Sequence, residues 1–325
     1  MTSGSLHWGI IGCGDVVMKK SGPSILQAGG SRIVAVMRRE AAKACPFAEA
    51  HGIALCTDDA AAVLNHPEVD IVYVATPPSS HRQYVVAAAE AGKHVLVEKP
   101  MGLSATEDRE MIAVCEAAGV ELFVAYYRRF HPHVLKMKEL IDSGRIGRPV
   151  SAAIEYAQPP APGTSWGGGW RVQPDVSGGG LFVDVVSHRI DLMVYLLGEP
   201  AEVCGLTAKV NPESRVEQTV SLAVRFAGDT LCSVSGSFAS LRWADRFVIA
   251  GTEGAIEAAS LDSHAFTLRA GKVEQEYRFD RDRAPHLGLV RHIERVLDGQ
   301  EGNASCGRQG MLADRVLDEG LRRGQ

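Results

Sequence analysis

The chain has no excess of positive charge and no long apolar run. Its 34 Lys and Arg residues are outnumbered by 39 Asp and Glu residues, and the formal net charge of −5 argues against a nucleic-acid partner. No stretch of about 18 apolar residues occurs, so we expect no membrane span. The first residues carry neither the basic start nor the apolar core of a signal peptide, and we therefore expect a cytoplasmic protein.

Paired-cysteine motifs are also lacking. The seven cysteines are odd in number and form no C-x-x-C pair, which argues against a disulfide framework and a zinc ribbon and for a reducing compartment. We expect each cysteine to be a small buried apolar side chain (Cys13, Cys45, Cys56, Cys115, Cys204, Cys232 and Cys306).

The residues that are present have an ordinary globular balance, 46% hydrophobic and 22% charged. At roughly 150 residues per domain, the length predicts two domains. Over the first 120 residues, apolar runs alternate with alanine-rich helix patterns (strands at 6–11, 33–37, 71–75, 94–97 and 122–125; helices at 83–90 and 105–118). Ser104 and Glu107 form a capping box for the second helix, and Gly119 is its expected C-cap. This alternation predicts a doubly wound parallel sheet.

The pattern changes after about residue 121. We expect a loop over the Gly-, Pro- and Trp-rich stretch 159–180, a helix over 181–197, and a hairpin at Gly228-Asp229. The remaining expected elements are mostly strands (strands at 150–157, 219–226, 230–238, 246–250, 256–259 and 265–268; helices at 134–142, 287–297 and 309–321). The sequence thus predicts an α/β domain over residues 1–121 and an α+β domain with an antiparallel sheet over 122–325, whose C-terminal helix can pack back on the first domain.

A glycine turn ends the first expected strand. Gly12-x-Gly14 lets the backbone approach a pyrophosphate, and the helix that follows, from Asp15 and Val16, presents its N-terminus to the negative charge. Val17 replaces the third glycine of the G-x-G-x-x-G motif, so the motif alone is weak. Its position in a βαβ unit favours dinucleotide binding.

Two arginines end the second expected strand, where an acidic residue usually binds the ribose of NAD. Arg38 and Arg39 suit the 2′-phosphate of NADP, because a guanidinium binds phosphate in a bidentate way. The sequence therefore favours NADP(H). NAD(H) is the alternative, with both arginines solvated and Glu40 on the ribose.

Further polar residues follow the third and fourth strands. Thr76, Pro77 and His81 lie at the carboxyl end of one, and Glu98 and Lys99 at the end of the next, where ligands bind in such sheets. Lysine in this place is a candidate acid or base.

A second group of titratable residues lies in the later helix. Asp184, His188 and Asp191 have the spacing i, i+4 and i+7, which puts them on one helix face. His188 is the natural proton donor near neutral pH, and Asp184 could orient it or bind a substrate hydroxyl. An Asp-His pair can also bind a metal ion, but we find no second cluster with further ligands and expect no metal.

Aromatic and basic residues accompany these groups. Trp170 and Arg171 precede the helix, and Tyr126 and Arg128 lie where the two domains join. Aromatic faces combined with hydrogen-bonding groups suit a polyol or sugar substrate.

These motifs resemble the glucose-fructose oxidoreductase, inositol dehydrogenase and rhizopine-catabolism (Gfo/Idh/MocA) family. The matching segments stand in order over nearly the whole chain (Gly12-Cys13-Gly14; Ala75-Thr76-Pro77-Pro78 with His81; 92–100; Arg128-Arg129-Phe130; 144–147; Gly178-Gly179-Gly180 with Asp184, His188 and Asp191; 251–254). The segment from Trp170 to the triple glycine is most similar to the 1,5-anhydrofructose reductase-like members.

The resemblance implies a Rossmann domain followed by an α+β domain with a large, mostly antiparallel, open-faced sheet, often used to form dimers or tetramers. It implies NAD(P)-dependent interconversion of a secondary alcohol and a carbonyl on a sugar or cyclitol, with Lys99, Asp184 and His188 as the catalytic set. Two alternatives stay open. One is a dinucleotide-binding sensor without chemistry; the other is an NAD-dependent glycoside-cleaving enzyme.

Overall fold

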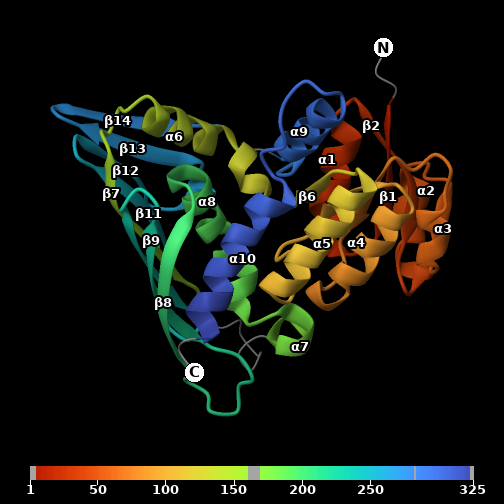
Figure 1. The fold of residues 1–325 in the computed structure, drawn as a ribbon, viewed down its shortest axis with the longest axis horizontal. Coiled ribbons are helices and arrows are strands. Elements are labelled where there is room, and N and C mark those ends of the chain that lie inside the picture. The colour runs from red at the N-terminus through yellow and green to blue at the C-terminus, as the bar shows by residue number, and fades with distance from the viewer. Residues whose placement is uncertain (1–4, 160–168, 282, 323–325) are drawn as a thin grey trace. The chain divides into compact units, whose positions relative to one another are not determined.

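The computed structural model describes residues 5–159, 169–281 and 283–322, which form two compact units (Figure 1). The first unit comprises residues up to Tyr127 together with Arg283–Met311, and the second comprises Arg128–Asp282 with the residues from Leu312 onward. The sequence places the domain boundary at 121/122, and the compact units assign 283–311 to the first of them. No helix among the described residues is both long and apolar enough to cross a membrane.

The first unit contains a six-stranded parallel sheet with the order β3-β2-β1-β4-β5-β6. This is the strand order of a Rossmann fold. All five expected strands are confirmed, and a short sixth was not expected (β1 Leu6–Ile11, β2 Ser31–Met37, β3 Leu55–Thr57, β4 Ile71–Val74, β5 His94–Val97 and β6 Leu122–Val124). The strands β1, β4 and β5 are almost wholly buried, as expected for a sheet covered on both faces.

Helical segments connect these strands (η1 Val17–Ser21, α1 Gly22–Gln27, η2 Ala41–Lys43, α2 Cys45–Ala50, α3 Ala60–Leu64, η3 Pro78–Ser80, α4 His81–Glu90 and α5 Ala105–Ala118). The capping prediction for α5 is confirmed, because Ser104 Oγ accepts a hydrogen bond from the Glu107 backbone N–H and Gly119 ends the helix at φ +67°. The late helix α9 (Leu287–Leu297) belongs to this unit through a buried chain of hydrogen bonds. The Trp8 indole donates to Ser31 Oγ, which donates to Glu294 at 2.6 Å.

The second unit is built on an eight-stranded sheet with the order β14-β13-β12-β11-β7-β10-β9-β8. Strands β7 and β10 run parallel, and the other neighbouring pairs run antiparallel. Six of its strands match expectation, whereas β8 and β14 were missed (β7 Pro149–Ala157, β8 Pro200–Ala208, β9 Thr219–Phe226, β10 Leu231–Ser237, β11 Ala244–Gly251, β12 Gly254–Ala258, β13 Ala265–Ala270 and β14 Val273–Arg278). β14 has almost no buried residue, so it carries no apolar pattern that a sequence analysis could detect.

Alternation along β9 shows how this sheet is half covered. Val220, Leu222 and Val224 are buried, while Ser221 and Ala223 between them are exposed. The unit's helical segments are η4 (Tyr127–Phe130, which begins at the last residue of the first unit), α6 (Pro132–Asp142), η5 (Gly169–Val172), α7 (Pro174–Ser177), η6 (Phe182–Val186), α8 (Ser187–Leu197), η7 (Leu261–Ser263) and the second part of α10 (Gly307–Arg322). Part of the loop expected over 159–180 lies outside the described residues. In the described part of this range the chain forms two short helical segments, η5 and α7.

Candidate functional site

The glycine turn after β1 has the geometry that close backbone approach requires. Gly12 has φ +97°, and a Cβ there would lie 2.7 Å from the carbonyl carbon and oxygen of Ala75. A Cβ on Gly14, in contrast, would have the Gly12 oxygen at 3.8 Å as its nearest neighbour. Gly12 is therefore needed by the fold, whereas Gly14 leaves the turn open on the side where a phosphate can approach. Val17 stands fully buried in place of the third glycine.

The helix after the turn begins with Asp15 and Val16 and continues through the π-helical turn η1. The Met18 N–H donates to the Gly14 carbonyl at 2.9 Å, so the helix starts directly from the turn. The exposed Asp15 carboxylate pairs with Lys19 at 2.6 Å. The arrangement presents a helix N-terminus at the end of β1, as a dinucleotide site requires.

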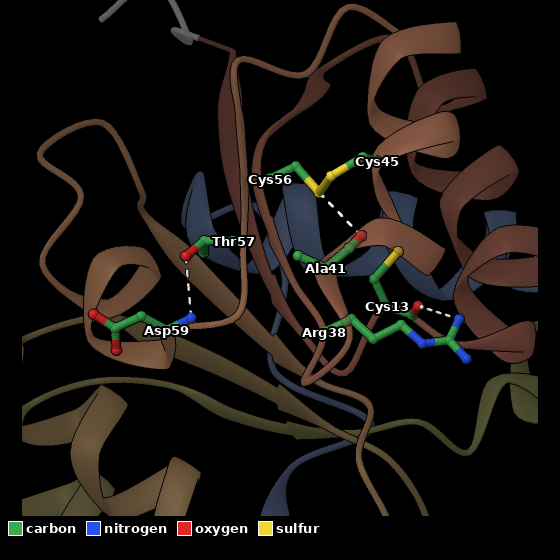
Figure 2. The surroundings of a disulfide bond; sticks show 7 residues. All are labelled: Cys13, Arg38, Ala41, Cys45, Cys56, Thr57 and Asp59. Carbon is green, nitrogen blue, oxygen red and sulfur yellow. Dashed lines mark hydrogen bonds between the residues drawn. A yellow bond between two sulfur atoms is a disulfide. The ribbon is translucent and has the colours of Figure 1, made fainter.

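Arg38 extends from the end of β2 to this same turn. Its Nη1 donates to the Cys13 carbonyl at 3.3 Å, and the side chain is half-buried (Figure 2). Arg39 and Glu40 are exposed, and the hydrogen bond from Lys43 lowers the pKa of the Glu40 carboxyl. Of the three residues, Arg38 is therefore the one that the structure holds beside the glycine turn.

A disulfide close to Arg38 corrects the cysteine expectation (Figure 2). Cys45 at the start of α2 and Cys56 in β3 are bonded, with Cα atoms 5.6 Å apart. The pair escapes a motif search because the two cysteines are 11 positions apart in the sequence and meet through the contact of α2 with β3. The prediction that the cysteines are buried is also wrong for Cys204, which is exposed, and for Cys306, which is half-buried. It is confirmed for three others (Cys13, Cys115 and Cys232).

The Glu98-Lys99 segment after β5 is fixed by a residue that the sequence analysis missed. The Tyr73 hydroxyl, fully buried in β4, donates to Glu98 Oε1 at 2.5 Å, and Glu98 Oε2 accepts from the Lys99 backbone N–H at 3.2 Å. Burial raises the pKa of Tyr73, so the phenol stays protonated and keeps donating. Lys99 is half-buried and precedes Pro100 through a cis peptide bond. The available signal was a single hydroxyl in the otherwise apolar strand Ile-Val-Tyr-Val.

His81 contacts backbone carbonyls on two loops and is completely buried. Its Nδ1 lies 3.1 Å from the oxygens of Pro100 and Met101, and its Nε2 lies 2.8 Å from the oxygen of Thr76. Burial lowers the pKa of His81, so the ring is neutral near pH 7. A neutral ring carries one N–H, so His81 donates to one of these two loops and packs against the other. Its contact with a cofactor stays a prediction.

In the second unit, Trp170, Arg171 and Asp184 form one cluster. The Arg171 guanidinium lies 4.6 Å from the Trp170 ring centroid and donates through Nε to Asp184 Oδ2 at 2.9 Å. All three remain partly or largely exposed. Gly179 just before the helix is required by packing, since a Cβ there would clash with a methyl group of Val183. An aromatic face, a guanidinium and a carboxylate therefore meet at the start of the helix.

The three titratable residues expected on one helix face lie in different environments. Asp184 lies in the π-helical turn η6 and pairs with Arg171, whereas Asp191 is fully buried in α8 and pairs with Arg129. Between them, His188 is buried with 9% of its surface exposed. Asp191 therefore has a structural partner that the spacing could not reveal.

Two further residues expected to bind substrate are largely enclosed. Tyr126 is fully buried after β6, and Arg128 is 14% exposed and pairs with Asp262 at 2.7 Å. Their contact with substrate stays a prediction.

Two family models match the chain. The model described as "Oxidoreductase family, NAD-binding Rossmann fold" matches residues 6–126, and the model described as "GFO/IDH/MocA C-terminal domain" matches residues 134–257. Among curated proteins, "Oxidoreductase P35" of Formosa agariphila is 38% identical over 271 residues, which is 83% of this chain and 84% of that protein. The 1,5-anhydro-D-fructose reductase of Ensifer adhaerens is 30% identical over 280 residues, covering 84% and 83% of the two chains.

Solved structures share the fold over the whole length. A levoglucosan dehydrogenase in complex with NADH and levoglucosan superposes with a TM-score of 0.90 at 21% identity, covering 98% of this chain and 97% of that one. The aldose-aldose oxidoreductase of Caulobacter crescentus, complexed with glycerol, gives 0.88 at 24% identity, with the same coverage. With the Rossmann strand order and the eight-stranded sheet, these matches show that the chain belongs to the Gfo/Idh/MocA family of oxidoreductases.

Proposed function

We propose that the protein is an NAD(P)-dependent dehydrogenase or reductase that interconverts a secondary alcohol and a carbonyl on a sugar or cyclitol. The observation that carries the proposal is the glycine turn, in which Gly12 has no room for a side chain while Gly14 is open. A bound nicotinamide supplies the hydride chemistry, and the protein supplies position and electrostatics. The turn, the helix start at Asp15-Val16 and Arg38 are the groups that hold the dinucleotide.

NADP(H) is the cofactor that we favour. Arg38 is half-buried beside the Cys13 carbonyl, at the end of the strand where the adenosine ribose is bound in such folds. A 2′-phosphate gives this guanidinium a charge-assisted partner, which the ribose hydroxyl of NAD does not. NAD(H) is the alternative cofactor, with the backbone or Glu40 on the ribose.

The test of the cofactor is a pair of fluorescence titrations, with NADPH and with NADH, on the wild type and on Arg38→Ala. We expect tighter NADPH binding by the wild type and a loss of about tenfold or more of that preference in the variant, which corresponds to a charged hydrogen bond of about 1.4 kcal/mol or more. Arg32→Ala is the matched control, because Arg32 is an exposed arginine near the opposite end of β2. Tighter NADH binding contradicts the NADP preference, and binding of neither cofactor contradicts the proposed function.

Proton transfer is assigned to Lys99 and His188, with Asp184 as the positioning group. Lysine and histidine both exchange protons in enzyme sites, and Asp184 is already oriented by Arg171 at 2.9 Å. Trp170 and Arg171 offer the stacking face and the donors that suit a polyol. We assign substrate contacts also to Tyr126 and Arg128.

The test of these roles is turnover on a panel of sugars and cyclitols. We expect Lys99→Ala and His188→Ala each to lower kcat by roughly 100-fold or more, the usual contribution of a general acid or base, with NADPH affinity retained. Unchanged kcat in both variants would sink the assignment. Activity on a glycoside without net change of cofactor would favour the glycoside-cleaving alternative.

We propose further that the exposed face of the second sheet binds a second copy of the chain. On this face Leu206 in β8 and Leu231 in β10 are 73% and 55% exposed, and small residues such as Ala223 lie between them. A dimer or tetramer by light scattering is expected, and dissociation by Leu206→Glu with Leu231→Glu is the check. A monomeric wild type contradicts this assembly.

A further inference from the structure

Three histidines gather in the second unit, and none of them has a role in the proposed chemistry. His131, His133 and His264 are all buried, and each offers a ring nitrogen such that the three atoms lie within 4.8 Å of one another. The rings also contact one another, with centroids 4.8 Å apart for His133 and His264 and 5.2 Å apart for His131 and His264. The two segments thus bring three nitrogen donors together in the interior of the unit.

Local structure holds these side chains in place. His131 is the residue before α6 and His133 lies in its first turn, on either side of Pro132, which starts the helix. His264 ends η7 and adopts the left-handed conformation, with φ +54°, which a residue other than glycine adopts at an energetic cost. The η7 turn is itself anchored, because Ser260 Oγ donates to Asp245, which also accepts from Arg189. The fold therefore brings a strained histidine against a pair that is already fixed by a helix start.

The donor set of the cluster, three buried imidazole nitrogens, suits a transition-metal ion. Neutral imidazole is the metal-binding form of histidine. The Nδ1 atom of His133 has no hydrogen-bond partner and lies buried, with the residue 1% exposed. Arg128 also faces the group, but its charge is balanced by Asp262 at 2.7 Å.

We propose that His131, His133 and His264 form a binding site for one divalent transition-metal ion of the zinc class. Zinc bound to histidine has Zn–N distances of about 2.0–2.1 Å, which puts tetrahedral ligands roughly 3.4 Å apart. Small side-chain rotations close the present separations to that value, and a water molecule or an anion completes the fourth position. The bound ion links the end of η7 to the start of α6 and thereby stabilises the second unit.

This site differs from the one considered in the sequence. The Asp184-His188 pair was judged to lack further ligands, and the structure pairs Asp184 with Arg171 instead. The new cluster draws its third ligand from a position 131 residues beyond His133, so only the His-Pro-His segment was visible as a local signal.

The experiment uses tag-free, full-length protein that has been stripped with a chelator and then titrated with Zn²⁺ or Co²⁺ alone. By equilibrium dialysis with metal analysis we expect one Zn²⁺ per chain, and with Co²⁺ the visible absorption bands of a low-symmetry, four-coordinate site. Zn²⁺ at 100 times its Kd is expected to raise the Tm of the second unit by roughly 5–11 °C. No bound metal in the wild type, or no shift in Tm, overturns the proposal.

Variants separate this site from surface binding. His264→Asn keeps a residue that tolerates the left-handed conformation, and His133→Gln keeps a similar volume; each is expected to lose the bound metal and the Tm shift. His51→Gln, at an exposed histidine of the first unit, is the matched control and is expected to keep both the bound metal and the Tm shift.

Circular dichroism without metal identifies a variant that fails to fold, in which case the other variant decides. Metal retained in a folded His264→Asn, or lost in His51→Gln, places the ion elsewhere and overturns the proposal. NADPH binding is measured in the same samples, so failure of the metal site is distinguished from failure of the proposed function.

Discussion

The buried pair Arg129–Asp191 allows a direct test of what it costs to break an ion pair inside the protein. The Asp191 carboxylate is 0% exposed and the Arg129 side chain is 1% exposed. The guanidinium contacts both carboxylate oxygens, since Arg129 Nε donates to Asp191 Oδ1 at 3.0 Å and to Oδ2 at 2.9 Å. Since Asp191 lies three residues beyond His188 on α8, the pair also fixes the helix that carries a proposed catalytic group.

Removing one partner leaves the other as an uncompensated buried charge. Asp191→Asn is therefore expected to cost about 3–5 kcal/mol in the free energy of unfolding. For a unit of 150–250 residues, each kcal/mol lowers Tm by roughly 2–4 °C, so the expected fall is roughly 6–20 °C. Differential scanning calorimetry is the assay, because it can resolve separate transitions for the two units.

Replacing both partners tests whether the loss is an unpaired charge or lost packing. Arg129→Met combined with Asp191→Leu removes both charges and keeps apolar volume, and is expected to recover most of the stability or exceed the wild type. Asp175→Asn is the control, because it breaks an exposed pair with Arg215 and is expected to cost less than about 1 kcal/mol. A single variant within about 1 kcal/mol of the wild type, or a double variant as unstable as Asp191→Asn, would refute the reasoning.

Four further predictions concern the first unit and the thiols. Cys45→Ser with Cys56→Ser is expected to lower the free energy of unfolding by about 3 kcal/mol, the loop-closure entropy for a separation of 11 residues, measured by chemical denaturation; no change contradicts a formed disulfide. Gly12→Ala is expected to cost about 1–3 kcal/mol because it combines a positive φ with a 2.7 Å contact, whereas Gly14→Ala keeps stability and weakens NADPH binding; equal stability of the two variants would contradict this assignment. The exposed thiol of Cys204 is expected to react with iodoacetamide in the folded protein, whereas three buried thiols react only on unfolding (Cys13, Cys115 and Cys232). Burial raises the pKa of Cys13 to about 11 and the pKa of Cys115 and of Cys232 to about 12. Since these folded-state pKa values lie above the ordinary 9.0, the stability linked to these protons is complete below pH 9 and is lost as pH rises towards 12; constant stability over that range would argue against the shifts.

Elements with a strong local pattern were predictable, and those without one were not. The helix α5 begins and ends where Ser104 and Gly119 indicate, because capping depends on residues within one turn. The strand β3 has three half-buried residues and β14 has almost no buried residue, so neither carries the period-two pattern on which a strand prediction depends. The disulfide was mispredicted for a related reason, since it joins residues that lie in a helix and an adjacent strand.

The candidate site divides in the same way. Gly12 and Gly14 were identified from the sequence because a glycine turn between a strand and a helix is a local feature. The partners that orient the site are distant in the sequence: Tyr73 holds Glu98 from another strand, and Arg171 reaches Asp184 across the triple-glycine loop. Such hydrogen bonds depend on distances that only the folded chain defines.

The sequence by itself determined the Rossmann domain, the antiparallel second sheet and the family, because strand periodicity, helix caps and ordered motifs are written in neighbouring residues. Tertiary structure decided which charges are buried and paired, which cysteines are bonded and which histidines meet. Arg129 pairs with Asp191, 62 residues away, and His133 contacts His264 across a longer separation, because strand pairing and helix packing bring remote segments together. Burial then changes the chemistry of these groups, since a side chain removed from water must be satisfied by its protein neighbours.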